Sequence, residues 1–412
     1  MNQADNAWVL ASSALVLLMT PGLAMFYGGM TRSKNVLSTM MHSFFLMAMA
    51  SIIWMFYGFS LAFAPDAVRG WLGGSHYFFL NNIGAGLFPD LVDPSKTMTI
   101  PGTTFMIFQC MFAVITPALI SGAFAERMKF SSFVLFMLLW ITFVYCPIAH
   151  WVWGPGGWLS GMGALDFAGG TVVHINAAAA ALACAIVIGK RKGYGHTAMI
   201  PHNLTLTLLG AGLLWVGWFG FNAGSALAAS EGAAMAFVVT HMATAAAAMS
   251  WLFAEWVIKG KPTTLGLASG AVAGLVAITP ASGFVGPVSS VILGAVAGVL
   301  CYLAVLAKSS LGYDDALDVV GVHGVGGIWG ALATGLFASK LINPTGGDGL
   351  FFGNPGQLWI QFVAVVATIV YSLVVTTIIL YIVKAVVGLK VSEEEEVVGC
   401  DTSEHGETAY SI

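Results

Sequence analysis

Long apolar runs, separated by short polar stretches, follow one another along almost the whole sequence. A helix that crosses a membrane needs about 20 mostly apolar residues, and eleven runs are of roughly this length. We expect spanning helices at residues 7–31, 38–64, 97–123, 129–149, 170–190, 203–222, 233–257, 264–280, 285–308, 322–340 and 357–388. The pattern therefore predicts an all-α, polytopic membrane protein with eleven transmembrane helices.

The composition favours the same class of protein. The sequence is 58% apolar and only 8% charged, whereas soluble domains carry about 25% charged residues. Its 50 glycines suit helices that pack closely in lipid. A net charge of −4 without a basic patch argues against a nucleic-acid partner. The five cysteines show no paired spacing, and neither a Walker loop nor an HExxH motif is present. We therefore expect a protein that binds no metal or cofactor and is not an enzyme.

Basic residues fall mainly after alternate runs. Twelve of the 15 lysines and arginines are expected on one side of the membrane, which leaves Arg69, Lys96 and Lys340 on the other. Because loops rich in Lys and Arg stay in the cytoplasm, this bias predicts an N-terminus outside and a C-terminus in the cytoplasm. No basic residue precedes Arg32, so the first run is expected to be a retained span rather than a secretory signal.

Two stretches far apart in the chain share one pattern, Asp166-Phe-Ala-Gly-Gly-Thr-Val-Val-His174 and Asp318-Val-Val-Gly-Val-His323. In each, an Asp precedes a Val-His pair that small residues follow. Each histidine lies in the last of five expected spans, so we expect an internal repeat whose two histidines meet. An odd number of spans turns the second half upside down relative to the first, and inverted repeats carry a substrate path at their interface.

This repeat predicts the organisation of the chain. A transmembrane domain at 1–388 comprises repeat one at about 7–190, repeat two at about 203–340 and a long helix eleven at about 357–388, which is expected to brace the outside of the bundle. The remaining tail, 389–412, is polar and acidic. Such a composition is typical of a segment that is flexible when alone.

An ordered set of short motifs resembles the Amt/Mep/Rh family of ammonium transporters, and closely its bacterial Amt branch. Besides the two histidine stretches, the motifs are Phe26-Tyr-Gly-Gly-Met30, Ala149-His-Trp-Val-Trp153, Gly217-Trp-Phe-Gly-Phe-Asn-Ala-Gly-Ser225 and His405-Gly-Glu-Thr-Ala-Tyr410. The resemblance implies a homotrimer in the inner (cytoplasmic) membrane with one substrate path per protomer. It also implies a regulatory tail that takes part in block by a PII-type signal protein. A solubilising acidic end is the less favoured alternative that composition leaves open.

The histidines within spans are the first candidates for function. A histidine in a span is rare and often marks a pathway; the alternative is a packing residue bonded to a nearby carbonyl, and for His42 and His241 both interpretations stay open. The family places the rings that match His174 and His323 side by side in a narrow pore. A neutral imidazole both donates and accepts a hydrogen bond, so the pair can guide a small polar molecule or pass a proton.

Trp218, Phe221 and Ser225 lie at i, i+3 and i+7 and therefore share one helix face. Alone, such a stripe is more typical of helix packing. The resemblance implies instead an outer NH4+ site made of Phe112, Trp153 and Ser225, a gate made of Phe112 and Phe221, and a pore lined partly by Trp218. Aromatic faces attract a cation by roughly 0.5–2 kcal/mol, and the serine hydroxyl accepts an N–H.

Asp166 stands just before a predicted helix start, where a carboxylate can cap backbone N–H groups. A direct cation ligand is the less favoured alternative, and the resemblance implies a structural part that shapes the outer site. Asp318 is expected to cap the matching helix of the second half.

The predicted function is transport of ammonium, ammonia or methylammonium. NH4+ is recruited at the outer site, loses its proton near the gate and passes the twin histidines as ammonia, and a separate path for the proton makes transport electrogenic. One alternative is an ammonium sensor of the same fold, and another is a Rh-like neutral gas channel. An intramembrane histidine enzyme or metalloprotein is a third class, for which the sequence lacks a nucleophile or a ligand set.

Overall fold

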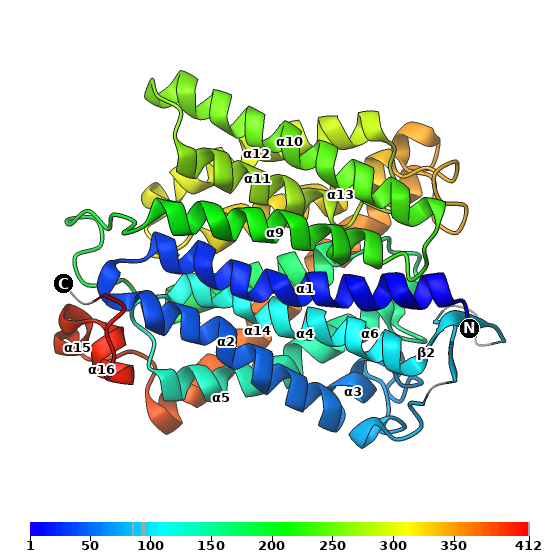
Figure 1. Cartoon of the computed structure of the whole chain (residues 1–412), viewed down its shortest axis with the longest axis horizontal. Helices are drawn as coiled ribbons and strands as arrows, with labels where there is room; N and C mark the ends of the chain where they lie inside the picture. The colour runs from blue at the N-terminus through cyan, green and yellow to red at the C-terminus, as the bar shows by residue number, and fades with distance from the viewer. Residues whose placement is uncertain (85, 92–94, 411–412) are drawn as a thin grey trace.

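Long helices lying side by side make up most of the computed structural model, which describes residues 1–84, 86–91 and 95–410 (Figure 1). The helices of the first half are α1 (Gln3–Met30), α2 (Val36–Ile53), α3 (Phe59–Phe63), α4 (Gly102–Phe124), α5 (Phe130–Trp140), α6 (Cys146–Trp153), α7 (Trp158–Gly161) and α8 (Asn176–Ile188). Three π-helical turns continue or introduce these helices: η2 (Trp54–Gly58), η4 (Ile141–Tyr145) and η5 (Gly170–Ile175).

The second half and the tail are also helical. Their helices are α9 (Leu204–Gly224), α10 (Glu231–Lys259), α11 (Thr264–Ile278), α12 (Pro287–Leu311), α13 (Val325–Phe337), α14 (Pro355–Val387), α15 (Glu393–Val398) and α16 (Cys400–His405). A fourth π-helical turn, η6 (Val320–Gly324), leads into α13. Short 3-10 turns are η1 (Ser33–Asn35), η3 (Phe78–Leu80) and η7 (Leu350–Phe352).

The eighth expected span is shorter than the others. Among the described residues, ten helical segments are long and apolar enough to cross a membrane, and α11 has only 15 residues. A helix of that length extends about 22 Å, less than the roughly 30 Å of a bilayer core. Pro280 and Ala281, which follow α11, are fully enclosed by protein, and non-helical backbone is tolerated at membrane depth under that condition.

The third span begins later than predicted. Residues 97–101 were expected to be helical, but Thr97–Pro101 forms strand β2, which pairs antiparallel with β1 (Leu87–Pro89). Proline pushes the residue before it toward extended backbone. Pro101 therefore keeps the chain extended up to the first residue of α4, Gly102.

The first helices of the two halves, α1 and α9, lie side by side and run in opposite directions (Figure 1). The N–H of Asn203, at the start of α9, donates to the carbonyl of Gly29 at the end of α1 (3.1 Å). At the other end, the indole N–H of Trp8 donates to the carbonyl of Ala223 (3.2 Å). A Cβ at Gly210 would lie 2.3 Å from the backbone of α1, so a small residue is needed for this contact. An inverted second half requires this antiparallel arrangement.

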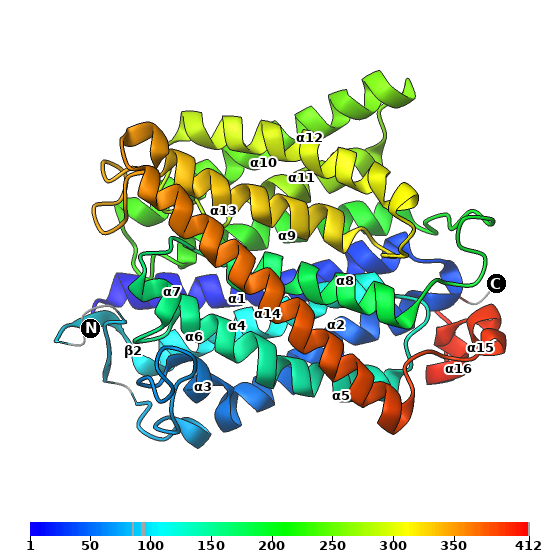
Figure 2. The ribbon, with the colours of Figure 1, turned by 180° about the vertical axis from the view of Figure 1, so that it is seen from behind.

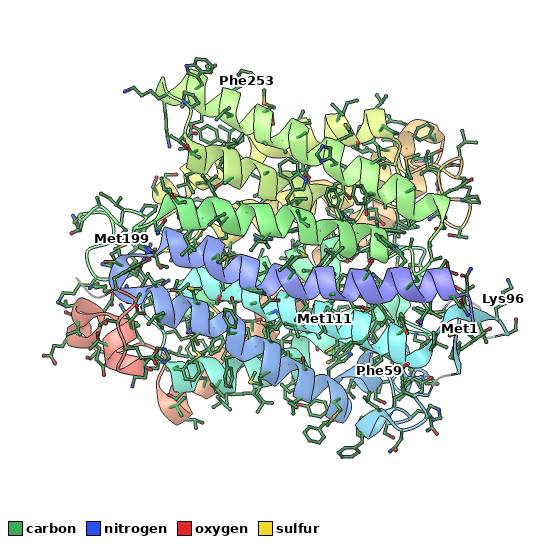
Figure 3. All side chains as sticks on the ribbon, in the orientation of Figure 1. Met1, Phe59, Lys96, Met111, Met199 and Phe253 are labelled. Atoms are coloured by element: carbon green, nitrogen blue, oxygen red, sulfur yellow. The ribbon has the colours of Figure 1, made fainter. Side chains whose placement is uncertain are left out.

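Helix α14 crosses the outside of the bundle diagonally over α5, α8 and α13 (Figure 2). Its polar side chains point inward: the Ser372 hydroxyl donates to the carbonyl of Asn176 (2.9 Å), and the Thr376 hydroxyl accepts from the indole N–H of Trp140 (3.0 Å). Large apolar side chains such as Phe253 of α10 point away from the bundle (Figure 3). The lateral surface therefore suits contact with lipid.

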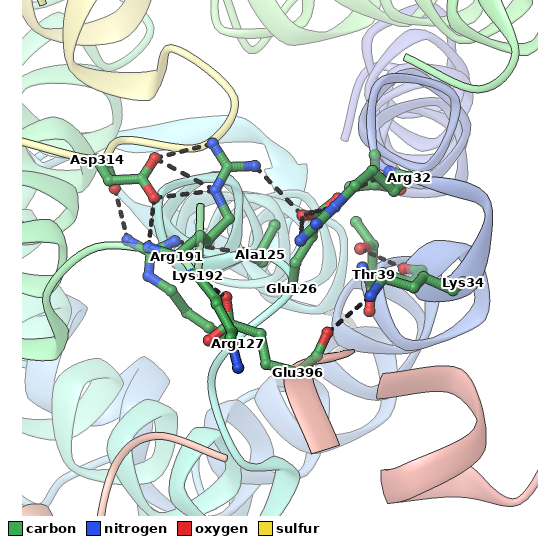
Figure 4. Close-up of polar contacts among 12 residues, drawn as sticks. Arg32, Lys34, Thr39, Ala125, Glu126, Arg127, Arg191, Lys192, Asp314 and Glu396 are labelled. Carbon is green, nitrogen blue, oxygen red and sulfur yellow. Dashed lines mark hydrogen bonds and ion pairs between the residues drawn. The ribbon is translucent and has the colours of Figure 1, made fainter. Parts of the chain in front are cut away.

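A buried ion-pair network ties the two halves together at the end of the bundle where α1 ends, which we call the basic end (Figure 4). Arg191 bonds Asp314 through two nitrogens, at 2.8 and 2.9 Å, and reaches Glu126 at 3.4 Å; Arg32 also pairs with Glu126 (2.6 Å). Burial acts against the charge of Asp314, but Arg191 and Arg127 outweigh it, so the pKa of this carboxyl lies below its usual value.

The tail, which composition predicts to be flexible when alone, packs on the basic end as two short helices, α15 and α16. The Lys34 ammonium donates to the carbonyl of Glu396 (2.8 Å), and the buried Glu396 carboxylate pairs with Lys390 (3.1 Å). In α16, the Asp401 carboxylate accepts from the N–H of Ser38 (2.8 Å). The turn after α1 and the start of α2 thus supply partners that order the tail.

The network predicts the effect of Asp314→Asn on stability. The change removes the main counter-charge of the buried Arg191 guanidinium, and breaking one side of a buried pair typically costs about 3–5 kcal/mol. We expect a clearly lower thermal unfolding midpoint in detergent. Glu393→Gln is the matched control because it removes only the exposed partner of Lys192, and we expect it to leave the midpoint unchanged. Equal midpoints for both variants would contradict a stabilising role of the network.

Candidate functional site

Asp166 organises the turn from which η5 begins. Its carboxylate accepts hydrogen bonds from four successive backbone N–H groups, those of Gly169 (2.9 Å), Gly170 (2.5 Å), Thr171 (2.8 Å) and Val172 (3.2 Å). These donors lie at a helix start and have no partner within the helix. Gly169 adopts φ +117°, which residues with a Cβ rarely adopt. The Asp166 side chain is thus bound by the backbone, and its own carbonyl accepts from the indole N–H of Trp153 (2.9 Å).

The helix start of the second half has a similar cap, but Asp315 provides it rather than Asp318. The Asp315 carboxylate accepts from the N–H of Val320, the first residue of η6 (2.7 Å). Burial raises the pKa of Asp315 to about 6. Asp318, the residue expected to cap, has φ +62° and pairs with Lys308. The prediction for Asp318 was wrong because the aspartate three residues earlier is the one that reaches the helix start.

His174 and His323 meet inside the bundle. Their Nδ1 atoms are 3.3 Å apart, their ring planes are inclined by 28°, and the residues are only 1% and 3% exposed. Each ring belongs to a π-helical turn, η5 or η6. Such turns are rare and frequently occur at functional sites. The structure thus brings together the two histidines that the repeat pattern singled out.

Thr279, which no sequence motif marks, holds one side of this pair. Its hydroxyl donates to the carbonyl of Leu275 (2.7 Å) and accepts from the indole N–H of Trp218 (2.9 Å), and Nε2 of His174 lies 3.4 Å from the same oxygen. Because the only hydroxyl proton goes to Leu275, we assign the proton of His174 to Nε2. Nδ1 of His174 is then an acceptor, and His323 donates to it from its own Nδ1.

A row of aromatic rings leads from the histidines toward the end of the bundle opposite the basic end. The Phe221 ring stacks near His174, with centroids 6.1 Å apart, and Phe112 lies against Phe221 at 4.4 Å. Trp153 meets Phe112 edge-on at 5.7 Å. Both phenylalanines are fully buried, so they separate the space around Trp153 from the histidine pair.

A cavity of about 190 Å³ lies beyond Phe112, and its wall contains all three residues expected at the outer site, Phe112, Trp153 and Ser225. The Ser225 hydroxyl donates to the carbonyl of Phe221 (2.8 Å). Gln109 also lines this cavity, although the sequence analysis did not select it. Its position three residues before Phe112, on the same helix face, is the signal that would have found it.

A second, smaller cavity of about 20 Å³ reaches His323 from the basic end. Its wall includes Tyr27, Trp251 and Asp318. The two cavities therefore lie on opposite sides of the histidine pair. Phe112 and Phe221 stand between the larger cavity and the pair, whereas the smaller cavity reaches His323 directly.

The other two histidines of the spans occupy different surroundings. His42 is buried among phenylalanines, with Phe133 closest at 4.3 Å between centroids, and neither of its ring nitrogens has a partner among the described residues. His241 is exposed on α10 beside Trp215, at 5.4 Å. The ring contacts described for these two residues do not include His174 or His323.

The helices, the apolar lateral surface and the central histidine pair define a multi-pass membrane protein with a polar site between two cavities. The chain belongs to the ammonium transporter family, because the sequence model of the Ammonium Transporter Family matches residues 7–410. This match confirms the family that the motifs indicated.

Individual relatives agree with this assignment. An ammonium transporter of Bacillus subtilis (strain 168) is 52% identical over 412 residues, which cover 100% of this chain and 99% of that protein. The crystal structure of Saccharomyces cerevisiae Mep2 is 36% identical with a TM-score of 0.88, covering 95% of this chain and 91% of that chain. A structure described as a sensor Amt protein is 31% identical with a TM-score of 0.88 and covers 98% of each chain. The Bacillus relative is named a transporter, not an enzyme.

The cap at η5 predicts that Asp166→Ala lowers the stability of the fold and also impairs the functional site. The change leaves four helix-start N–H groups without their acceptor, and one such buried orphan typically costs about 1–3 kcal/mol. We expect a lower thermal unfolding midpoint, measured by tryptophan fluorescence in detergent, and loss of ammonium transport. Asp348→Ala removes one hydrogen bond from a loop and serves as the control, with both properties near wild type. A wild-type midpoint for Asp166→Ala would contradict the capping role.

Proposed function

We propose that this protein transports ammonium across the cytoplasmic membrane, recruiting NH4+ at the outer cavity and conducting ammonia past His174 and His323. The observation that carries this proposal is the row of closely spaced rings from Trp153 through Phe112 and Phe221 to the histidine pair. Family membership supports ammonium as the substrate.

Recruitment uses the wall of the outer cavity. Phe112 and Trp153 present aromatic faces to a cation, and such contacts contribute roughly 0.5–2 kcal/mol. The Ser225 hydroxyl donates its hydrogen bond to the carbonyl of Phe221, so its oxygen remains able to accept an N–H from the ion. Asp166 shapes this site through its hydrogen bond with Trp153 and does not itself bind the ion.

Deprotonation follows at the gate formed by Phe112 and Phe221. Beyond these rings a cation meets buried aromatic and imidazole groups, and an isolated charge in such surroundings costs tens of kcal/mol in the Born limit. Ammonium avoids this cost by transferring a proton to water of the outer cavity, which gives NH3 and H3O+, whereas potassium, an ion of nearly the same size and charge, has no proton to transfer. Ammonia then passes Trp218, His174 and His323.

The proton crosses separately, which makes net transport electrogenic. The two imidazoles share one hydrogen bond between their Nδ1 atoms, and a ring that donates from one nitrogen and accepts at the other can pass a proton along. Water in the smaller cavity continues this route from His323 toward the basic end. On the other side of the pair, the proton passes the rings of Phe112 and Phe221, as ammonia does.

The assembly is a homotrimer with one path in each protomer. The basic end faces the cytoplasm, so the N-terminus is outside and the C-terminus inside, as the bias of Lys and Arg indicates. Within residues 1–388, repeat one and repeat two are inverted copies, which the opposite directions of α1 and α9 support, and α14 braces them. Methylammonium is a second substrate.

The tail, 389–412, is a regulatory segment that binds a PII-type signal protein at the cytoplasmic face. Its support is the packing of α15 and α16 against η1 and the start of α2, through Lys34 and Ser38.

Two alternatives keep the same fold. A sensor that binds ammonium with little flux is supported by the structural similarity to a sensor Amt protein. A Rh-like neutral gas channel differs in carrying no current. Solid-supported membrane electrophysiology and an ammonia uptake assay on reconstituted protein separate all three together. A saturable current in ammonium supports the proposal, uptake without current supports a neutral gas channel, and ammonium binding with neither current nor uptake supports a sensor.

Replacing both histidines tests the mechanism. In the double variant His174→Leu/His323→Leu the polar route between the cavities is lost, so we expect the ammonium current to fall at least tenfold or to be accompanied by a potassium current. The measurement compares currents in ammonium, methylammonium and potassium from equal amounts of reconstituted protein.

His241→Leu is the matched control, because it removes another histidine of a span that is exposed on α10. We expect its ammonium current to equal that of wild type. An unchanged ammonium current together with unchanged exclusion of potassium in the double variant would refute the role proposed for the pair.

Deleting residues 392–412 tests the tail. The deletion removes α15 and α16 with their bonds to Lys34 and Ser38, and we expect PII binding to fall at least tenfold in surface plasmon resonance. Ammonium current of the same variant, measured without PII, shows whether transport also needs the tail. If neither binding nor current changes, the segment is only an acidic end.

A further inference from the structure

We infer that Gln109 is a second hydrogen-bond acceptor for ammonium in the outer cavity, beside Ser225. The inference rests on the proposed function and extends it, because it names a residue that sets the affinity of the recruitment site. It starts from a buried amide oxygen that has no hydrogen-bond partner among the described residues.

Gln109 lies on α4 three residues before Phe112 and lines the same cavity of about 190 Å³. The side chain is only 8% exposed, and its Oε1 is buried without a hydrogen-bond partner among the described residues. Leaving a buried amide oxygen without a donor is unfavourable. A protein that keeps such a group at the wall of a cavity therefore has a donor to meet it there.

The cavity supplies the place for this donor. Rotation about the last side-chain bond of Gln109 brings its oxygen to the cavity side without a change in volume, because the amide oxygen and nitrogen are nearly equal in size. A bound ammonium ion or a water molecule then donates a hydrogen bond to this oxygen. Ammonium is the stronger donor because its N–H groups carry positive charge.

The other polar groups of the wall leave room for this role. The indole N–H of Trp153 is directed to the carbonyl of Asp166 (2.9 Å) and so does not point a competing donor at a cation. The Ser225 hydroxyl donates to Phe221 (2.8 Å) and turns its lone pairs to the cavity.

The resulting site fits the shape of the ion. Ammonium has four tetrahedral N–H groups, and the wall presents oxygen acceptors from Ser225 and Gln109 and aromatic faces from Phe112 and Trp153, with Ser160 and Phe167 also in the wall. Acceptors satisfy N–H groups in fixed directions, and the aromatic faces attract the remaining charge.

Gln109→Leu tests the inference. Leucine fills a similar volume and removes the unpaired amide, so the variant is expected to unfold at the same or a higher temperature than wild type. The half-saturating ammonium concentration, measured from peak currents of reconstituted protein, is expected to rise about tenfold, the scale of one hydrogen bond to a charged group. The maximal current is expected to change less than twofold, because the residue acts before the gate.

Gln109→Glu moves the affinity in the opposite direction. It keeps an acceptor of the same length and adds negative charge, so the half-saturating ammonium concentration is expected to fall below the wild-type value. Cys110→Ala, on the neighbouring buried position of α4 and outside the cavity wall, is the control for disturbance of the helix and is expected to stay within twofold of wild type.

The outcomes distinguish a failure of the proposed function from a failure of the role assigned to Gln109. A wild-type protein without saturable ammonium current defeats the proposed function. A working wild type whose half-saturating concentration is the same in Gln109→Leu, at equal or higher thermal stability, overturns the assignment of Gln109 and leaves the proposed function standing. Opposite shifts in Gln109→Leu and Gln109→Glu support it.

Discussion

Helices that start or stop inside a membrane leave backbone N–H and C=O groups with no water to bond them. At the centre of this protein, side chains form hydrogen bonds with the free backbone groups at such helix ends. The carboxylate of Asp166 accepts from the first amides of η5, and that of Asp315 accepts from the first amide of η6. The hydroxyl of Thr279 bonds back to the helix as α11 ends. These bonds fix the directions of the two π-helical turns, and therefore the positions of His174 and His323.

The histidine pair that results is asymmetric. With the assigned protons, both nitrogens of His174 have partners, Nε2 at Thr279 and Nδ1 at His323. His323 uses Nδ1 as its donor, so its Nε2 is an acceptor, and this residue also lines the smaller cavity. A molecule that arrives from the basic end therefore meets a ring with a free acceptor, whereas one that arrives past Phe221 meets a ring already bonded by the protein.

Hydropathy located most helices within a few residues, since bilayer thickness sets their length; α9, for example, was expected at 203–222 and spans Leu204–Gly224. The motifs brought Asp166 and the histidine pair to attention. The π-helical turns and the early end of α11 were not predicted, because tertiary contacts decide them. Gln109 and Thr279 are isolated polar residues in apolar helices, which sequence alone does not separate from packing residues. The order of the tail depends on partners such as Lys34, which composition cannot supply.

The number of oxygen and nitrogen acceptors that each part of the proposed path offers explains how ammonium is distinguished from potassium, an ion of nearly the same size. In the outer cavity a cation finds the oxygen of Ser225, the amide of Gln109 and two aromatic faces. Past Phe112 the next polar groups are the indole N–H of Trp218 and the nitrogens of His174, which are already engaged with Thr279 and His323. Potassium would lose its water ligands there and gain nothing comparable, at the cost of a charge in low dielectric. Ammonium loses only a proton and continues as a neutral molecule. Selectivity then arises from the loss of acceptors beyond the gate and not from the width of the passage.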